Sequence, residues 1–385
     1  MISETNKQRV CWILSSKWVG IIGGGQLGMM LTEEIHNFGS KTVVLDPDNT
    51  CPCTHVADEF ICASFDDYAA LKELCQKSDV VTYEFENVKS HFLIDLEAKY
   101  NIKQGIRPLF DSQDRLREKE NAKKHGLKTA RFFSCQSRAE LDQAVKELGY
   151  PCIYKTRTLG YDGHGQVILY SDKDKDTVEP YLNVEGIVEE FIDFDLEVSV
   201  IMVRDGDKTI VFPIGKNIHK NGILDLSIVP TKLSRDLENR LKEASVRFME
   251  SADYRGILCI EYFVKNSDFY FNEMAPRPHN SGHYTIEGCT TNQYRELVKF
   301  LLGVSLEEPK LKSPTVMKNI LGQDLWMVPK FEKPNALKTD QDLYVHMYSK
   351  KETRPLRKMG HVTMTNMTEE EYKEFYERKI CVADK

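Results

Sequence analysis

Blocks of apolar residues alternate with polar stretches along the 385 residues, and their spacing predicts a protein of mixed α/β structure. The apolar runs Trp18–Ile22 and Lys41–Leu45 have the length of buried strands. Between them, the stretch Met29–Phe38 has the length and pattern of a helix that ends at Gly39. These three segments predict a βαβ unit, which favours a parallel sheet.

The rest of the chain repeats the two patterns. Further strands are predicted at Asp79–Tyr83, Gly186–Ile192, Leu196–Val203, Lys208–Phe212, Ile257–Val264, Phe269–Ala275 and Val316–Leu321. Further helices are predicted at Tyr68–Gln76, Ala139–Leu148, Leu237–Ala252 and Asn292–Leu302. The charged run Asp114–Glu120 also predicts a helix, and most charge runs are solvated faces.

Two irregular segments predict domain boundaries. Arg107–Gln113 is rich in turn-forming residues, and Glu308–Pro314 is rich in proline and lysine. We therefore expect an N-terminal α/β domain at 1–112, a central domain at 113–310 and a small C-terminal domain at 311–385.

A glycine-rich hairpin loop lies at the start of the central domain. The strands Tyr150–Tyr154 and Val167–Tyr170 flank Gly160–Gln166, and Lys155 stands at the base of the loop. Three glycines within six residues let backbone N–H groups approach an anion closely. The loop lacks the Gly-Lys-Ser/Thr of a P-loop. It predicts either a phosphate-binding lid or an ordinary mobile turn.

A second glycine-rich turn follows the first strand. Gly23, Gly25 and Gly28 satisfy the pattern G-x-G-x-x-G, and Asp46 ends the next strand. A dinucleotide site has this arrangement, but the same turn also occurs beside other phosphorylated ligands. After the strand Asp79–Tyr83, two carboxylates at alternate positions share one face, which is either a ligand crevice or a solvated edge; they are Glu84 and Glu86.

A pair of glutamates predicts a metal site. If the hairpin of Ile257–Val264 and Phe269–Ala275 is centred on Ser267, Glu261 and Glu273 are cross-strand neighbours. At ~5 Å and an effective dielectric near 20, two carboxylates repel by about 3 kcal/mol. A divalent cation between them relieves this repulsion, and Mg²⁺ takes carboxylate and phosphate oxygens.

Composition narrows the classes of function. A net charge of −7 and a pI near 5.9 argue against sequence-independent nucleic-acid binding. The ten scattered cysteines predict reduced thiols, and no run of 18 apolar residues occurs, so we expect a cytoplasmic protein. Lys350–Lys358 holds five cations and one acid, a local charge of +4. This segment is either a solvated face or a site for a phosphate monoester.

These motifs together resemble a known family. Gly160–Gln166 (GYDGHGQ), with Lys155 upstream, is similar to the phosphate-covering loop of the ATP-grasp enzymes, and most of all to that of the 5-(carboxyamino)imidazole ribonucleotide synthetases. The segments GGGQLG, EFENV, APRPHNSGH and KKETRPLRKMGH resemble the same family in the same order. The resemblance spans roughly Val19 to Thr365.

The resemblance implies an ATP-grasp fold with a Rossmann-like N-terminal domain and a small C-terminal domain. It implies carboxylation of 5-aminoimidazole ribonucleotide by bicarbonate and ATP in purine biosynthesis, through carboxyphosphate. The implied cofactors are ATP and Mg²⁺. We also expect a homodimer, no membrane or nucleic-acid partner, and a downstream mutase that acts as a separate protein.

The resemblance also implies residue roles. Nucleotide contacts fall on Arg115, Lys155, Gly160, Tyr161, Asp162, Gly163, His164, Gly165, Gln166, Glu189, Glu190, Phe191, Ile192, Glu197, His219, Asn272 and Glu273. Substrate contacts fall on Gln26, Leu27, Glu84, Glu86, Tyr161, Asp162, Arg277, Lys350, Arg354, Arg357 and Lys358. Glu261 and Glu273 bind the metal, while Lys155, Arg277 and Asp162 act in catalysis, Asp162 by positioning or deprotonating the amine.

Three positions depart from the family pattern, and three other functions stay open. Leu159 and Leu356 replace glycines, and His164 replaces a lysine or arginine. The alternatives are another ATP-grasp ligase such as the formate-dependent glycinamide ribonucleotide transformylase, an NAD-dependent dehydrogenase, and a non-catalytic nucleotide sensor.

Overall fold

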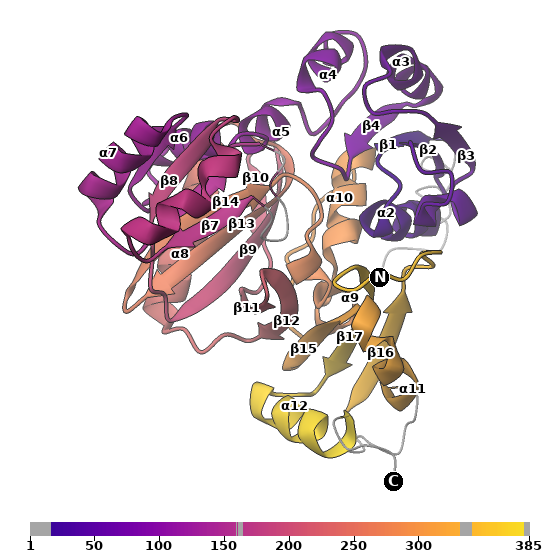
Figure 1. Ribbon diagram of the computed structural model, residues 1–385. Helices are drawn as coiled ribbons and strands as arrows, with labels where there is room; N and C mark the ends of the chain where they lie inside the picture. Colours follow the sequence, from indigo (N-terminus) through magenta and orange to yellow (C-terminus); the bar gives the residue numbers. More distant parts are fainter. Residues whose placement is uncertain (1–16, 159, 161–164, 332–340, 381–385) are drawn as a thin grey trace.

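The N-terminal part forms a parallel sheet. The computed structural model describes residues 17–158, 160, 165–331 and 341–380 (Figure 1). Its first sheet has the order β3-β2-β1-β4, with β1 (Trp18–Ile22), β2 (Lys41–Asp46), β3 (Glu59–Cys62) and β4 (Val80–Tyr83). The helices of this part are α2 (Gln26–Asn37), α3 (Tyr68–Lys77) and α4 (Ser90–Glu97). The predicted βαβ unit is confirmed.

A small antiparallel sheet carries the glycine-rich hairpin. Its order is β5-β8-β6-β7, with β5 (Phe132–Cys135), β6 (Cys152–Thr156), β7 (Gln166–Leu169) and β8 (Gly186–Glu190). The helix α7 (Arg138–Leu148) buries Leu141 and Val145 against Cys152 and Tyr154 of β6. Lys155 pairs with Gln166, so the base of the predicted loop is a regular hairpin.

A nine-stranded sheet forms the centre of the molecule. Its order is β14-β13-β9-β11-β12-β15-β17-β16, and β10 pairs with β9. The strands are β9 (Leu196–Asp205), β10 (Lys208–Val211), β11 (Gly215–Lys220), β12 (Ile223–Val229), β13 (Gly256–Lys265), β14 (Asp268–Ala275), β15 (Thr315–Leu321), β16 (Asp342–Met347) and β17 (Lys358–Thr365). Because β12 pairs with β15, the strands after residue 311 extend the sheet of the central part.

Two long helices cover opposite faces of this sheet. Helix α8 (Arg235–Ser251) packs on the face of β9 that carries Val198 and Val200, and α10 (Gln293–Leu302) packs on the face that carries Ile201. Helix α10 also contacts α2, which attaches the N-terminal sheet to the large one (Figure 1). The shorter helices α9 (Thr285–Gly288), α11 (Val328–Phe331) and α12 (Glu369–Phe375) lie near the C-terminal strands.

One sequence prediction about the segment before the small sheet is wrong, and one alternative is ruled out. The turn-rich segment Arg107–Gln113 is the helix α5 (Arg107–Ser112), because Pro108 occupies the first turn, where its missing N–H costs nothing. The charged run forms α6 (Arg115–Lys124) as expected, with Asp114 as its N-cap. However, Arg115, Glu118 and Lys119 are buried, so this face is not solvated.

No helix within the described ranges has both the length and the apolar character needed to cross a membrane.

Candidate active site

The two glutamates predicted to bind metal face each other across the hairpin of β13 and β14. Glu261 pairs with Glu273 in the antiparallel register, as predicted. The predicted centre of the hairpin is wrong, because Lys265 pairs with Asp268 around a two-residue turn. A bulge next to Glu261 shifts the register by one residue and restores the pairing of the glutamates.

The two carboxylates have different surroundings. Glu261 is buried and accepts hydrogen bonds from Ser199 Oγ at 3.3 Å and Asn217 Nδ2 at 3.2 Å. Burial and the nearby charges of Glu197 and Glu273 raise the pKa of Glu261. Such a like-charge pair is the environment in which a bound divalent cation is most favourable, and the oxygen ligands suit Mg²⁺.

Glu273 is more open and lies beside an arginine. Its side chain is 41% exposed, and its Oε2 accepts a hydrogen bond from Arg115 Nη1 at 3.0 Å. Burial opposes ionisation, but the charge and hydrogen bond of Arg115 hold the pKa of Glu273 below its usual value. Arg115, predicted to reach the nucleotide phosphates, is therefore placed at the predicted metal site.

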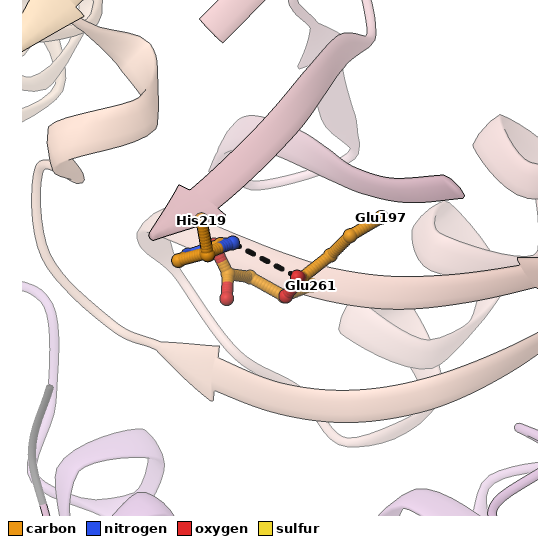
Figure 2. Close-up of side chains that lie close together, drawn as sticks. All are labelled: Glu197, His219 and Glu261. Carbon is orange, nitrogen blue, oxygen red and sulfur yellow. Dashed lines mark ion pairs between the residues drawn. The ribbon is translucent and has the colours of Figure 1, made fainter. Parts of the chain in front are cut away.

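Three side chains from three strands of the large sheet meet at Glu261. Figure 2 shows Glu197 from β9, His219 from β11 and Glu261 from β13, with the Nδ1 of His219 2.9 Å from Oε2 of Glu197. One potential ligand atom from each lies within 4.8 Å of the others. Burial alone would lower the pKa of His219, but the ion pair with Glu197 raises it to about 9. The ion pair thus favours the protonated imidazole, which holds Glu197 in place, while the carboxylates are the ligands that suit Mg²⁺.

Lys155 is buried at the end of β6, and its partner is Glu189. The Nζ of Lys155 lies 3.2 Å from Oε2 of Glu189, and the same oxygen is 3.1 Å from Nζ of Lys119. Burial lowers the pKa of Lys155, whereas Glu189 raises it, with lowering as the net result. Sequence reasoning placed Glu189 at the nucleotide but missed Lys119. The signal was the spacing of Lys119 from Arg115, four residues, which puts both on one helix face.

The glycine-rich loop is only partly within the described residues. Leu159, Tyr161, Asp162, Gly163 and His164 lie outside them, so their predicted roles stay predictions. Gly165 has φ +73°, and a Cβ there would lie 2.5 Å from Thr156 Oγ1. A larger residue at 165 would therefore be strained by this φ and would crowd Thr156.

The segment predicted to hold adenine leaves its strand earlier than expected. Strand β8 ends at Glu190, so Phe191 and Ile192 follow it as partly exposed irregular backbone. The side chain of Glu190 pairs with Arg131 at 3.2 Å. The carboxylates of Glu189 and Glu190 are thus paired with cations, and the Glu190 N–H donates to the Arg131 carbonyl at 2.8 Å.

Two carboxylates at the ends of β2 and β4 accept hydrogen bonds from the glycine turn that follows β1. Gly24 N–H donates to Asp46 Oδ2 at 2.7 Å, and Gly25 N–H donates to Glu84 Oε1 at 2.8 Å. A dinucleotide needs these N–H groups for its pyrophosphate and Asp46 for its ribose. Because both N–H groups are already bonded to carboxylates, this turn does not provide the dinucleotide site that a dehydrogenase needs. Burial raises the pKa of Glu84 to about 7.

Leu27, which is predicted to contact the substrate, lies in the first turn of α2. It is buried in the apolar cluster that joins α2 to α10, so only its backbone N–H, in the first turn of α2, can reach a ligand. Gln26, at the first position of the same helix, is partly exposed.

Arg277 links the N-terminal sheet to the metal hairpin. It follows β14 by two residues, and its Nε lies 2.9 Å from Oε1 of Glu86. Burial would lower the pKa of Arg277, but the carboxylates of Glu86 and Glu84 raise it. The motifs EFENV and APRPHNSGH, distant in sequence, are thus in contact.

The cationic C-terminal segment folds back toward the glycine turn. Lys350 Nζ donates to the Lys358 carbonyl at 2.8 Å, and Arg357 Nη1 donates to the Glu352 carbonyl at 2.9 Å. Arg354 pairs with Glu352. Hydrogen bonds from Thr50 lower the pKa of Asp48, and the charges of Arg357 and Lys351 add to this, which places the segment near the end of β2.

Leu356, which stands where the family pattern has glycine, lies in a turn with a positive φ. Its φ is +65°, and its N–H donates to Gln323 Oε1 at 2.8 Å. Leucine therefore stands here in a left-handed conformation, which glycine adopts without strain.

Three family models match successive parts of the chain. The ribonucleotide synthetase preATP-grasp domain matches residues 16–109, the ATP-grasp domain 120–294, and the phosphoribosylaminoimidazole carboxylase C-terminal domain 315–374. The N5-carboxyaminoimidazole ribonucleotide synthase of Staphylococcus aureus (strain COL) is 41% identical over 92% of this chain and 95% of its own.

Solved structures similar to this chain come from the same family. The Staphylococcus aureus N5-carboxyaminoimidazole synthetase complexed with ADP has a TM-score of 0.89 at 40% identity, over 94% of this chain and 96% of its own. The Aspergillus clavatus N5-carboxyaminoimidazole synthase in complex with ADP and 5-aminoimidazole ribonucleotide has a TM-score of 0.87 at 28% identity, over 95% and 98%.

The fold and the buried carboxylates and cations of this site define an ATP-dependent ligase of the ATP-grasp class. The chain belongs to the family of N5-carboxyaminoimidazole ribonucleotide synthases within it.

Proposed function

We propose that the chain uses ATP and bicarbonate to carboxylate the exocyclic amine of 5-aminoimidazole ribonucleotide, giving N5-carboxyaminoimidazole ribonucleotide in purine biosynthesis. The observation that carries this proposal is the position of Arg277 between Glu86, which follows β4 of the N-terminal part, and the hairpin that holds Glu273. An anion activated at the nucleotide phosphates would thus form beside a substrate held by the N-terminal part.

The chemistry needs an anion site next to the phosphates. An oxygen of bicarbonate attacks the γ-phosphorus, ADP leaves, and carboxyphosphate forms. The amine then takes the carboxyl carbon, phosphate leaves with the attacking oxygen, and the amine loses a proton to a base. Lys155 and Arg115 would hold the phosphates, and Arg277 would hold the bicarbonate with two parallel N–H groups. Mg²⁺, held by Glu261 and Glu273, would neutralise phosphate charge.

The remaining predicted contacts complete the nucleotide site. Backbone groups of Glu189 to Ile192 would meet the adenine, and Glu197, held by His219, would accept from the ribose hydroxyls. Asn272 and the lid residues Gly160 to Gln166 would enclose the phosphates. Asp162 would position or deprotonate the amine.

The ribonucleotide would lie across the N-terminal and C-terminal parts. The N–H groups of Gly24 and Gly25 already donate to Asp46 and Glu84. The phosphate of the ribonucleotide would therefore bind the cations of the C-terminal segment instead. Those cations are Lys350, Arg354, Arg357 and Lys358. Glu84, Glu86, Gln26 and the backbone of Leu27 would then face the ribose and the aminoimidazole.

The organisation of the protein is also proposed. We divide it into domains at 1–112, 113–310 and 311–385, and each family match lies inside one of them. The cysteines that the structure describes are all free, which supports a cytoplasmic location. We further propose a homodimer and a mutase that acts as a separate protein.

A turnover assay in which either bicarbonate or formate is supplied tests the proposal. The protein is incubated with Mg²⁺, ATP and 5-aminoimidazole ribonucleotide, with bicarbonate or formate added separately. ADP release that is stoichiometric with a labile carboxylated product, and that depends on bicarbonate, supports the assignment. Formate-dependent turnover would move the chain to the formate-dependent ligases, and ATP binding without turnover would favour a sensor. NADH should neither bind nor be oxidised.

A further inference from the structure

Helix α6 holds the strand that carries Glu273 at three successive residues. Arg115, Glu118 and Lys119 occupy one face of the helix, at positions i, i+3 and i+4. Arg115 donates to the Glu273 carboxylate at 3.0 Å, the Met274 N–H donates to Glu118 Oε1 at 2.6 Å, and Lys119 donates to the Asn272 carbonyl at 3.0 Å. The helix therefore fixes the bulged stretch of β14 on which Glu273 stands.

Lys119 has a second partner in a different sheet. Its Nζ lies 3.1 Å from Glu189 Oε2, and that oxygen also lies 3.2 Å from Nζ of Lys155. Asn272 belongs to the nine-stranded sheet, whereas Glu189 and Lys155 belong to the four-stranded sheet. One buried ammonium thus connects the two sheets, with its side chain 1% exposed.

We propose that Lys119 is a positioning residue that fixes the phosphate-binding lysine, Lys155, relative to the metal-binding carboxylate, Glu273. Because the proposed nucleotide site lies between the two sheets, a nucleotide–metal complex must contact both at once. The inference rests on the proposed nucleotide site. It assigns no direct contact with ATP to Lys119, whose donors are directed at Glu189 and Asn272.

The charges around Lys119 indicate that a variant without its ammonium group should still fold. Lys119→Met keeps the length of the apolar stem and leaves Lys155 and Glu189 as a pair of opposite charges, so no buried charge loses all its partners. Lys119→Gln is a second variant that retains an N–H donor for the Asn272 carbonyl but lacks the positive charge. Lys123→Met is the matched control, because Lys123 is exposed one turn further along the same helix.

Calorimetric titration of the full chain with ADP, with and without Mg²⁺, tests the inference without any turnover. Removing a residue that orients metal ligands typically lowers metal affinity or activity 10- to 100-fold, so Lys119→Met should weaken Mg²⁺–ADP binding by about tenfold or more. Lys119→Gln should behave similarly, and Lys123→Met should match the parent. The loss should be greater with Mg²⁺ than without it, because the connection to Glu273 matters only when metal is bound.

Two outcomes would overturn the inference, and they differ from failure of the proposed function. If both Lys119 variants lower the thermal midpoint but bind Mg²⁺–ADP like the Lys123 control, Lys119 only stabilises the fold. If the loss is the same with and without Mg²⁺, Lys119 does not act on the metal carboxylate. A parent protein that binds no ADP under either condition contradicts the proposed function itself.

Discussion

The Nε of Arg277 lies 2.9 Å from Oε1 of Glu86, so an arginine beside the metal hairpin is held by a carboxylate of the segment that follows β4. This contact joins the two parts of the chain that the proposed reaction must bring together. It also leaves the guanidinium partly paired before bicarbonate binds, which orients its remaining N–H groups.

Arg277→Lys should reduce bicarbonate-dependent ADP release by about a hundredfold, because a lysine keeps the charge but not the two parallel donors that stabilise a carboxylate-like anion. ADP affinity, measured by calorimetry, should stay close to that of the parent. Arg204→Lys is the control, since Arg204 forms an ion pair with Asp253 at 3.1 Å at the other end of β9. Equal losses in the two variants would place Arg277 outside the reaction.

Replacing either predicted metal ligand should raise the Mg²⁺ requirement. In Glu261→Gln and Glu273→Gln a single carboxylate has to hold the cation, so half-maximal activity should need more Mg²⁺ and the maximal rate should fall. Glu250→Gln, at an exposed position of α8, is the control. Overlapping Mg²⁺ titrations for the parent and both site variants would show that the pair is structural.

The glutamate pair also shows how far the sequence could predict the site. The alternation of β13 and β14 and their short connection were sufficient to predict that Glu261 and Glu273 face each other. The predicted turn was one residue too long, and no bulge was predicted; the bulge next to Glu261 compensates for the error in the turn. A bulge depends on tertiary contacts, such as that of Lys119 with Asn272, which have no local signal in the sequence.

Most strands and helices could be predicted because their apolar periodicity is strong. The burial of α6 could not, since its charged residues look like a solvated face until the partners of Lys119 and Glu118 on β8 and β14 are known. The contact of Arg277 with Glu86 was equally hidden, because 191 positions separate their numbers in the sequence.

Alanine at Arg354 or Arg357 should weaken binding of the ribonucleotide. Each charge-assisted contact with a phosphate contributes roughly 1.5 to 3 kcal/mol, so the KM for 5-aminoimidazole ribonucleotide should rise about tenfold or more. The KM for ATP should not change, and Arg247→Ala on the exposed side of α8 should leave both unchanged. An equal rise in both KM values would assign these arginines to another site.

Leu356→Gly should stabilise the protein relative to Leu356→Ala. Both variants remove the exposed leucine side chain, but only glycine adopts φ +65° without strain. The difference in the free energy of unfolding should be about 1 kcal/mol in favour of glycine, as measured by denaturant titration. A more stable alanine variant would mean that residue 356 does not keep the left-handed conformation in solution.

Glu84→Gln should change how stability depends on pH. Burial raises the pKa of Glu84 from its usual value near 4.5 to about 7, so the folded protein binds this proton more tightly than the unfolded chain. Its contribution to stability is therefore full below about pH 4.5 and is lost as the pH rises through about 7. The glutamine variant still accepts from Gly25 but cannot ionise. Its thermal midpoint should therefore rise relative to that of the parent between pH 5 and pH 8. A constant difference across this range would contradict the raised pKa.

The transfer of an oxygen atom tests the central claim most directly. Bicarbonate labelled with ¹⁸O is supplied with Mg²⁺, ATP and 5-aminoimidazole ribonucleotide, and the released phosphate is analysed by mass spectrometry. If bicarbonate attacks the γ-phosphorus and its carboxyl group then passes to the amine, the attacking oxygen stays on phosphorus, and each phosphate carries one ¹⁸O atom. Phosphate that carries only oxygen from ATP and water, formed at the same rate as the carboxylated product, would contradict the account.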